Sequence, residues 1–276
     1  MIRHVDISDS ALRALERHET AAHAIPSREV RDLGHAVVLY DPRDTEPFWN
    51  RMASVRWPDD EAGFDRRLTE ALALFAVLGR APHFWPSPVH SQPVDLAARL
   101  AREGFADTGG GHVMVLTEAA ACCPVAPAEL GRGVTLHGIR RAADAGPHDV
   151  ADMGLVLAES FGTLPGRAGE LAADLARTLD DVRVTLVLVR VDGEPAAAAK
   201  ATTFDGLTYL SSIGTRVAFR GRGLAGIATR HALALGRGRT PGTTYLGVFS
   251  GNAPALALYG RLGFASIGES PDMLLE

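Results

Sequence analysis

Residues 220–226 read Arg220-Gly221-Arg222-Gly223-Leu224-Ala225-Gly226, a glycine-rich turn that follows an apolar run and opens a helix. Glycine lets a backbone fold tightly enough for several amide N–H groups to point toward one place. The first N–H groups of the following helix have no partner inside it, and the helix dipole adds positive charge there. The segment therefore predicts a binding site for a polyphosphate.

The charge around this turn supports the same prediction. The stretch from Gly206 to Gly268 contains no Asp or Glu and holds seven arginines: Arg216, Arg220, Arg222, Arg230, Arg237, Arg239 and Arg261. The whole chain has a formal charge of −5, so this +7 segment leaves −12 for the remainder. Such a local reversal favours a bound polyanion, and the alternative is that neighbouring acidic segments cover the arginines.

The composition is that of a globular protein with apolar cores, since 46% of its 276 residues are hydrophobic. The chain has no apolar run long enough for a membrane span, and residues 1–6 are too polar for a signal peptide. We therefore expect a soluble, cytoplasmic protein with no membrane partner. The adjacent Cys122 and Cys123 lack metal-site spacing, so we expect no metal, and the negative net charge argues against nucleic acid. Both a monomer and a homodimer remain open.

The second half predicts a mixed α/β unit. Asp192-Gly193 and Asp205-Gly206 are hairpin turns, so the strands around them form an antiparallel meander that leads into residues 220–226. The expected elements are strands at 134–138, 182–191, 195–204, 207–215 and 244–249, helices at 148–160, 169–179, 224–235 and 254–262, and a last strand from Gly263-Phe264.

The first half repeats part of this pattern. Gly104-Phe105 precedes Gly263-Phe264 by 159 residues, and the same offset aligns Arg102 with Arg261 and residues 114–116 with 273–275. Upstream we expect a strand at 35–40, helices at 47–55 and 64–78, and a strand at 82–85. The predicted fold class is α+β, with two tandem units over residues 1–130 and 131–276, each a mostly antiparallel central sheet flanked by helices. The linker at 117–133 contains the two cysteines.

Two motifs carry a family resemblance. Residues 220–225 resemble the (Gln/Arg)-x-x-Gly-x-(Gly/Ala) loop of the GNAT superfamily of N-acetyltransferases. Downstream, Asn252-Ala253-Pro254-Ala255-Leu256-Ala257-Leu258-Tyr259, followed by Arg261-Leu262-Gly263-Phe264, resembles the second signature of that family. The two signatures stand in the family order at a typical separation, and the resemblance extends from Val134 to the C-terminus.

The resemblance implies transfer of an acetyl group from acetyl-CoA, as a cosubstrate, to a primary amine by direct attack. It implies that the backbone of Ile213 and Thr215 pairs with the pantetheine arm and that the amides of residues 220–226 hold the pyrophosphate. Asn252 would steady the arm, and Tyr259 would act as general acid to the departing CoA thiolate. In this family the strand before the loop and the strand at Gly247-Val248 splay apart to admit the thioester.

The acceptor and the base are less determined. A small amine, an aminoglycoside-like antibiotic, a peptide N-terminus and a lysine side chain all remain open as acceptors, and the −12 remainder mildly favours a cationic one. Because residues 206–268 hold no carboxylate, we hypothesise that deprotonation passes through water with Glu159 as a distant helper. Glu159 is equally explained as an exposed helix end.

The first unit lacks these functional residues. At the 159-residue offset, Leu100 matches Tyr259, Pro93 matches Asn252, and no arginine-glycine loop precedes them. We therefore predict that this unit binds no acetyl-CoA, and that it walls the acceptor site and shapes substrate choice.

Competing interpretations concern the same residues. Gly221-x-Gly223-x-x-Gly226 fits the dinucleotide-binding fingerprint, but the acidic residue expected about 20 positions later is absent and hairpins replace the crossover helix. A non-catalytic acyl-CoA sensor or interaction module is the second alternative, which the presence of Tyr259 and Asn252 disfavours. Taken singly, Asn252 is also explained as a helix cap and Tyr259 as an ordinary half-buried tyrosine.

Overall fold

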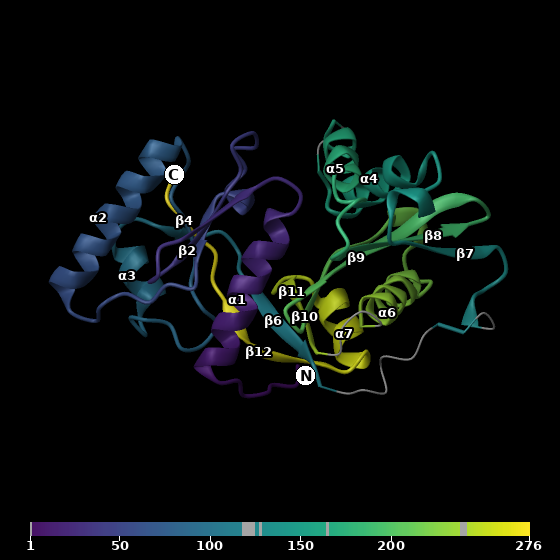
Figure 1. Cartoon of the computed structure of the whole chain (residues 1–276). Helices are drawn as coiled ribbons and strands as arrows, with labels where there is room; N and C mark the ends of the chain where they lie inside the picture. The colour runs from purple at the N-terminus through teal and green to yellow at the C-terminus, as the bar shows by residue number, and fades with distance from the viewer. Residues whose placement is uncertain (1, 118–124, 127–128, 164–165, 238–241) are drawn as a thin grey trace. The chain divides into compact units, whose positions relative to one another are not determined.

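The computed structural model describes residues 2–117, 125–126, 129–163, 166–237 and 242–276 (Figure 1). Cys122, Cys123 and Arg239 lie outside these residues. Two compact units are present: unit 1 comprises Met1–Val115, Gly247–Gly260 and Ala265–Glu276, and unit 2 comprises Leu116–Leu246 and Arg261–Phe264. Both combine helices with a sheet, which confirms the predicted fold class. The division into continuous domains 1–130 and 131–276 stays a prediction.

Unit 2 is built on the expected meander, whose strands are β7 (Val134–Ile139), β8 (Val184–Val191), β9 (Glu194–Phe204) and β10 (Leu207–Thr215). Each strand runs antiparallel to the one before it. The turns at Asp192-Gly193 and Asp205-Gly206 have positive φ at both residues, which matches the twist of a tight hairpin. Strand β11 (Thr243–Phe249) then pairs parallel to β10, with Leu207–Leu210 beside Thr243–Leu246.

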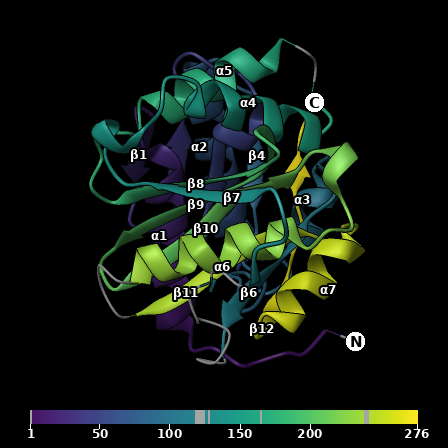
Figure 2. The ribbon, with the colours of Figure 1, turned by 90° about the vertical axis from the view of Figure 1, so that its right-hand side faces the viewer.

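Helices cover both faces of this sheet. Helices α4 (Asp149–Ser160) and α5 (Arg167–Ala176) lie on one face and α6 (Leu224–Arg237) on the other, as Figure 2 shows. The residues of β9 between them are small and fully buried: Ala196, Ala197, Ala198, Ala199 and Ala201. Small side chains let both helical layers approach the strand closely, which produces a dense core between α4 and α6.

Unit 1 contains a second sheet in which the last strand of the chain lies between two early ones. Its order is β1 (Glu29–Asp32), β2 (Val37–Tyr40), β3 (Arg51–Ala53), β4 (His83–Trp85), β13 (Met273–Leu274) and β5 (Ala106–Asp107). Strand β13 pairs antiparallel with β4 and with β5. Strand β6 (Gly111–Leu116) lies in the other sheet, between β12 (Phe264–Ser270) and β11. After Gly104-Phe105 the chain forms β5 in one sheet and β6 in the other. After Gly263 it forms β12 and β13, which are divided between the two sheets in the same way.

The core of unit 1 lies under α2 (Glu61–Leu78) and α3 (Leu96–Arg102). Phe75 and Leu100 from these helices pack on Met52 and Phe84 of the sheet. Helix α1 (Asp9–Ala24) packs against β1 and β2. Because side chains alternate across a strand, Val37 and Leu39 face α1 while Val38 faces the α2 core. Helix α7 (Ala253–Arg261) also belongs to unit 1, as far as Gly260.

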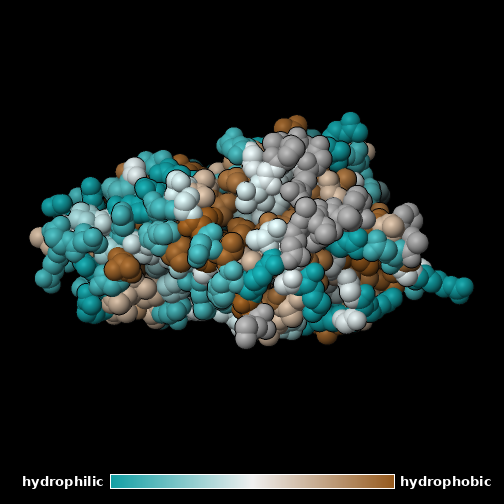
Figure 3. Space-filling view, turned by 90° about the horizontal axis from the view of Figure 1, so that it is seen from below, coloured by the Kyte–Doolittle hydropathy of each residue, from teal (hydrophilic) through white to brown (hydrophobic). Residues whose placement is uncertain are grey.

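The surface is largely polar on the face drawn in Figure 3, where hydrophobic residues form smaller groups among hydrophilic ones. Within the described parts of the chain, no helix combines the length and the apolar character that a membrane span requires.

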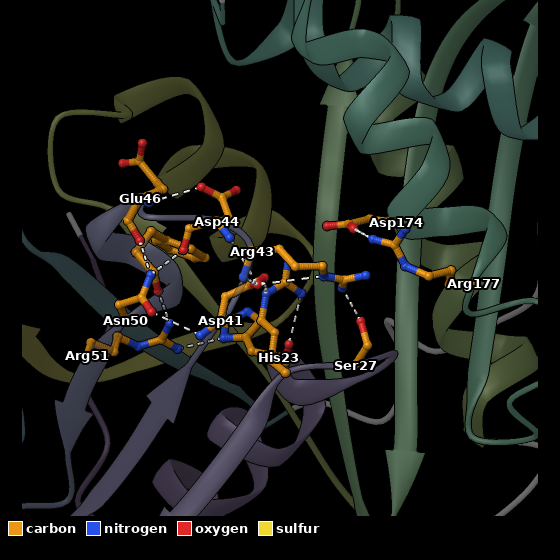
Figure 4. Close-up of polar contacts among 12 residues, drawn as sticks. His23, Ser27, Asp41, Arg43, Asp44, Glu46, Asn50, Arg51, Asp174 and Arg177 are labelled. Carbon is orange, nitrogen blue, oxygen red and sulfur yellow. Dashed lines mark hydrogen bonds and ion pairs between the residues drawn. The ribbon is translucent and has the colours of Figure 1, made fainter. Parts of the chain in front are cut away.

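The helix predicted at residues 47–55 is wrong. The structure has a 3₁₀ turn at Pro47–Trp49 and then strand β3. Figure 4 shows why: the side-chain amide of Asn50 donates to the carbonyls of Asp44 and Glu46, at 2.8 and 2.9 Å. Asn50 Oδ1 also accepts from the Asp41 amide at 2.9 Å, so one side chain holds residues 41–50 as a compact loop that leads into β3. Helix α1 and strand β1 were not predicted.

Candidate functional site

Strand β10 changes course near its end. Its ladder with β9 aligns Ser211 with Lys200 but Gly214 with Ala198, so β10 carries one extra residue there. Within this bulge Ser212 has φ of +51°, a conformation that residues other than glycine seldom adopt. Bulges redirect backbone groups and are common beside functional sites. Ile213 and Thr215, the residues predicted to meet a pantetheine arm, lie in and just after this bulge.

The same end of β10 holds polar groups that the fold does not use. Ser211 Oγ and Thr215 Oγ1 are buried and have no hydrogen-bond partner among the described residues. A buried hydroxyl without a partner costs about 1–3 kcal/mol, which a polar ligand or a water offsets. The register with β11 ends at Leu210 and Leu246, whereas β10 continues to Thr215. The last residues of β10 can therefore offer hydrogen bonds to a ligand.

The turn after β10 presents the amides that begin α6. Gly221 and Gly223 have φ of +77° and +75°, and a Cβ built on either would meet no atom within 4 Å. The carbonyl of Gly223 accepts the first helical bond, from Ile227 N at 3.2 Å. Gly223 has no side chain to cap the amides of residues 224–226. The buried Leu224 anchors the helix at this point, so open space lies over fixed N–H donors.

Two arginines of the turn keep their charge available. Arg220 donates to the carbonyls of Thr215 and Ser160, at 3.3 and 3.4 Å, and the guanidinium of Arg222 lies 5.9 Å from the ring centre of Phe219. Within the described residues, neither arginine forms an ion pair with a carboxylate. Acidic segments do cover other arginines of the cationic stretch, since Arg230 pairs with Glu129 and Arg216 with Glu159. Arg220 and Arg222 thus bring positive charge to the turn that opens α6.

Glu159, at the end of α4, is engaged by the chain that follows β10. Its two carboxylate oxygens accept hydrogen bonds from Arg216 Nε at 2.7 Å and from the Val217 amide at 2.8 Å. The bond from Arg216 is the main reason that the pKa of Glu159 lies below its usual value. A lower pKa makes a weaker base, and the helper role of Glu159 stays a prediction.

Asn252 and Tyr259 both belong to helix α7 and its start. Asn252 Oδ1 accepts from the Ala255 amide at 3.2 Å, so Asn252 caps α7, which was the second role considered for it. Tyr259 is buried, with 6% of its surface exposed, and burial raises the pKa of its phenol above the usual value. The phenol therefore keeps its proton at neutral pH, as a general acid must.

The structure thus collects the predicted site residues in two groups. Ile213, Thr215, residues 220–226 and Glu159 lie in unit 2, and Asn252 and Tyr259 lie in unit 1. Sequence reasoning missed the bulge at Ser212 and counted Arg216 only as a charge. The polar pair Ser211-Ser212, which interrupts the strand just before Gly214, was the available signal for an irregular strand.

Comparison with known proteins agrees with this geometry. Residues 157–264 match the model of the acetyltransferase (GNAT) family. Streptothricin acetyltransferase of Streptomyces lavendulae is 33% identical over 106 residues, which are 38% of this chain and 56% of that relative. The match thus spans little more than half the length of the relative. Residues 157–264 are thus similar to the acetyltransferase domain of the GNAT family.

Similarity to solved structures extends over nearly the whole chain. A GCN5-related N-acetyltransferase from Kribbella flavida superposes with a TM-score of 0.69 at 21% identity, covering 98% of this chain and 96% of that one. A tandem GNAT protein from the clavulanic acid biosynthesis pathway gives a TM-score of 0.61 at 16% identity, covering 93% and 87%. At these identities the likeness concerns the fold, and this chain has the tandem GNAT fold.

Proposed function

We propose that this protein is an acetyl-CoA-dependent N-acetyltransferase. The observation that carries the proposal is the start of α6, where two glycines of positive φ leave helix amides under open space. Beside them stand Arg220 and Arg222, which form no ion pair with any described residue. Amides, helix dipole and arginines together suit a ligand with several negative charges. The diphosphate of coenzyme A has that chemistry, and the family of residues 157–264 supports this choice of ligand.

The residues present fit such a ligand. The amides of residues 220–226 would hold the diphosphate, and the backbone of Ile213 and Thr215 would pair with the amide groups of the pantetheine arm. The buried hydroxyls of Ser211 and Thr215 supply further polar contacts at the same end of β10. Asn252 would steady the arm. When bound, acetyl-CoA supplies an activated acetyl thioester, and the remaining chemistry belongs to the protein.

Tyr259 would act as the general acid. As the amine nitrogen forms its bond to the acetyl carbon and the carbon–sulfur bond breaks, the phenol gives its proton to the sulfur. Direct attack needs no covalent intermediate on the protein. The amine would lose its own proton to water, with Glu159 as a distant helper, and water would return a proton to the phenolate of Tyr259. If Glu159→Gln leaves the pH profile of acetylation unchanged, that helper role is wrong.

The acceptor is proposed to be a cationic primary amine. Outside the cationic segment the chain carries −12, and an acidic surround raises the encounter rate with cations. The relative from Streptomyces lavendulae is named for acetylation of streptothricin, which makes streptothricin the first acceptor to test. Other small amines and peptide N-termini complete the panel.

The test combines binding with turnover. Calorimetry should show that coenzyme A binds to the protein, and a thiol-release assay with acetyl-CoA over the amine panel should identify an acceptor. Turnover with at least one amine supports the enzyme. Binding without thiol release on any acceptor would favour the alternative of a non-catalytic acyl-CoA sensor. Absence of binding by coenzyme A and by acetyl-CoA would refute both.

A further inference from the structure

The last turn of α4 contacts the connection between β10 and α6 at several points. Glu159 accepts from Arg216 and from the Val217 amide, and the carbonyl of Ser160 accepts from Arg220 at 3.4 Å. A Cβ on Gly214 would lie 2.6 Å from Ser160 Oγ, so α4 also packs directly on the backbone there. Two consecutive residues of α4 therefore contact the segment from residue 214 to residue 220.

Arg216 is held from a second direction by strand β9. Its NH1 group donates to the carbonyl of Pro195 at 2.9 Å, and its backbone amide donates to the carbonyl of Ala196 at 3.0 Å. The guanidinium therefore links α4 to β9 through two different nitrogens, Nε toward Glu159 and NH1 toward Pro195. This arrangement needs the planar fork of arginine, because a lysine ammonium has one nitrogen at one place.

The loop begins with a 3₁₀ turn at Val217–Phe219, and its last part, residues 221–223, contains little that would fix its direction. Gly221 and Gly223 both have positive φ, and a Cβ built on either would meet no atom within 4 Å. Glycine has the greatest backbone freedom of any residue, so the orientation of the amides in this part has to be set by neighbouring structure. Glu159 holds Arg216 and the Val217 amide, which lie shortly before residues 221–223 in the chain.

We propose that Glu159 is a positioning residue for the cofactor loop. By holding Arg216 and the Val217 amide, it sets the direction in which residues 217–223 leave β10, and hence the direction of the amides of residues 220–223 that precede α6. The ligand, a diphosphate of coenzyme A, rests on the proposed function, whereas the restraint on the loop does not. A loop restrained before binding loses less entropy when the ligand arrives, so the effect belongs in affinity.

The first test measures the affinity for coenzyme A by calorimetry. Glu159→Gln removes the charge and leaves one oxygen, and Arg216→Lys removes the fork; each should weaken binding on the order of tenfold, as expected for loss of a charged hydrogen bond. The double variant should weaken it little further, because both changes break the same link. Glu170→Gln is the matched control, since Glu170 pairs with Arg167 on the exposed surface of α5 at 2.9 Å.

The second test needs no ligand. Hydrogen exchange should become faster at the Val217 amide and in peptides covering residues 216–224 of Glu159→Gln, and stay unchanged in Glu170→Gln. Glu159→Asp, which keeps the charge at shorter reach, should recover part of the affinity and of the protection. A positioning role alone leaves the shape of the pH profile of kcat unchanged in these variants, whereas the helper role of Glu159 would change it in Glu159→Gln.

The outcomes separate the two proposals. Wild-type affinity and unchanged exchange in Glu159→Gln would overturn the positioning role. Wild-type affinity with a displaced pH profile would also overturn it, in favour of proton transfer by Glu159. If wild-type protein does not bind coenzyme A while exchange near Val217 still rises in the variant, the proposed function fails and the restraint on the loop is supported.

Discussion

Helices α2 and α6 are both long, and their first turns differ in how the backbone amides are satisfied. Helix α2 starts at Asp60, whose side chain accepts from the Gly63 amide at 2.8 Å, with Asp59 and Glu61 on either side. Helix α6 starts at Gly223 between arginines and contains no acid. Both helices have the same dipole and the same orphan amides. In α2 the carboxylate of Asp60 accepts a hydrogen bond from one of these amides. In α6 the corresponding amides remain for a ligand with negative charge.

Helices α3 and α7, which the 159-residue offset aligns, differ in the same sense. Leu100 of α3 is fully buried in the apolar core of unit 1, and its counterpart in α7 is Tyr259, which adds a hydroxyl to a buried position. Two related chain segments thus use one position for packing and one for a protonated phenol. The difference teaches that α2 and α3 are completed by capping and packing within the chain, whereas the proposed function uses Gly223 at the start of α6 and Tyr259 in α7.

The largest effect is expected from Tyr259→Phe. Removal of a general acid lowers kcat by about 10²–10⁴-fold, while the affinity for coenzyme A stays as in the wild type. Thiol-release kinetics and calorimetry measure the two quantities. Tyr40→Phe is the control, because the ring of Tyr40 lies under the guanidinium groups of Arg31 and Arg80, and its cation–π contacts do not need the hydroxyl. Full activity of Tyr259→Phe would remove the acid role.

The second effect concerns the helix start itself. Gly223→Asp gives α6 the kind of carboxylate that caps α2, and should weaken coenzyme A binding roughly 100-fold, about 2.7 kcal/mol, through repulsion and occupied amides. Gly223→Asn has the same shape and the same backbone strain without the charge, so it should bind more tightly than the Asp variant. Equal affinities of the two variants in calorimetry would show that charge does not explain the difference between α2 and α6.

The third effect probes the other side of the comparison. Asp60→Ala removes the cap of α2 and should lower the free energy of unfolding by about 1 kcal/mol. Coenzyme A affinity should not change, because α2 is predicted to bind none. Denaturant unfolding and calorimetry measure both, and Asp60→Asn should restore most of the stability. A change in affinity for Asp60→Ala would contradict the prediction that residues 1–130 bind no acetyl-CoA.

The smallest effect is on the pH dependence of stability. Glu159 has a pKa below its usual value of 4.5 in the folded chain, so its contribution is present above that value and is lost as the pH falls through the folded pKa. The difference in stability between wild type and Glu159→Gln should therefore shrink from pH 7 toward pH 3. Denaturant unfolding at several pH values measures it, and a difference that grows in acid would contradict the ion pair with Arg216.

Strong local signals made most of unit 2 predictable. Two Asp-Gly turns separate three strands of β-branched or small residues, and the structure places β9 and β10 within a residue of the predicted limits. Helix α6 begins at Leu224 as expected from the glycines before it. The bulge at Ser212 was harder to predict, because the polar pair Ser211-Ser212 indicates an irregular strand but not the close packing of Ser160 on Gly214 beside it.

Unit 1 was harder because its local signals conflict. Phe48, Met52 and Val55 have a helix-like spacing, yet the side chain of Asn50 holds the preceding residues as a loop and the chain continues as β3. Arg51 illustrates the same point, since it is 1% exposed and its guanidinium lies 3.7 Å from the ring centre of Trp85. A local sequence pattern does not predict a buried arginine, because the residues that contact its guanidinium come from distant parts of the chain.

The sequence by itself determined the meander, the glycine turn and the acid-free cationic segment, because each depends on the chemistry of adjacent residues. Only the tertiary structure decided which arginines stay unpaired, that Glu159 holds Arg216, and that β13 lies between β4 and β5 while β6 lies between β12 and β11. These features depend on pairings between residues far apart in the chain. Local propensity does not encode such pairings, since backbone hydrogen bonds between strands are the same for almost any sequence.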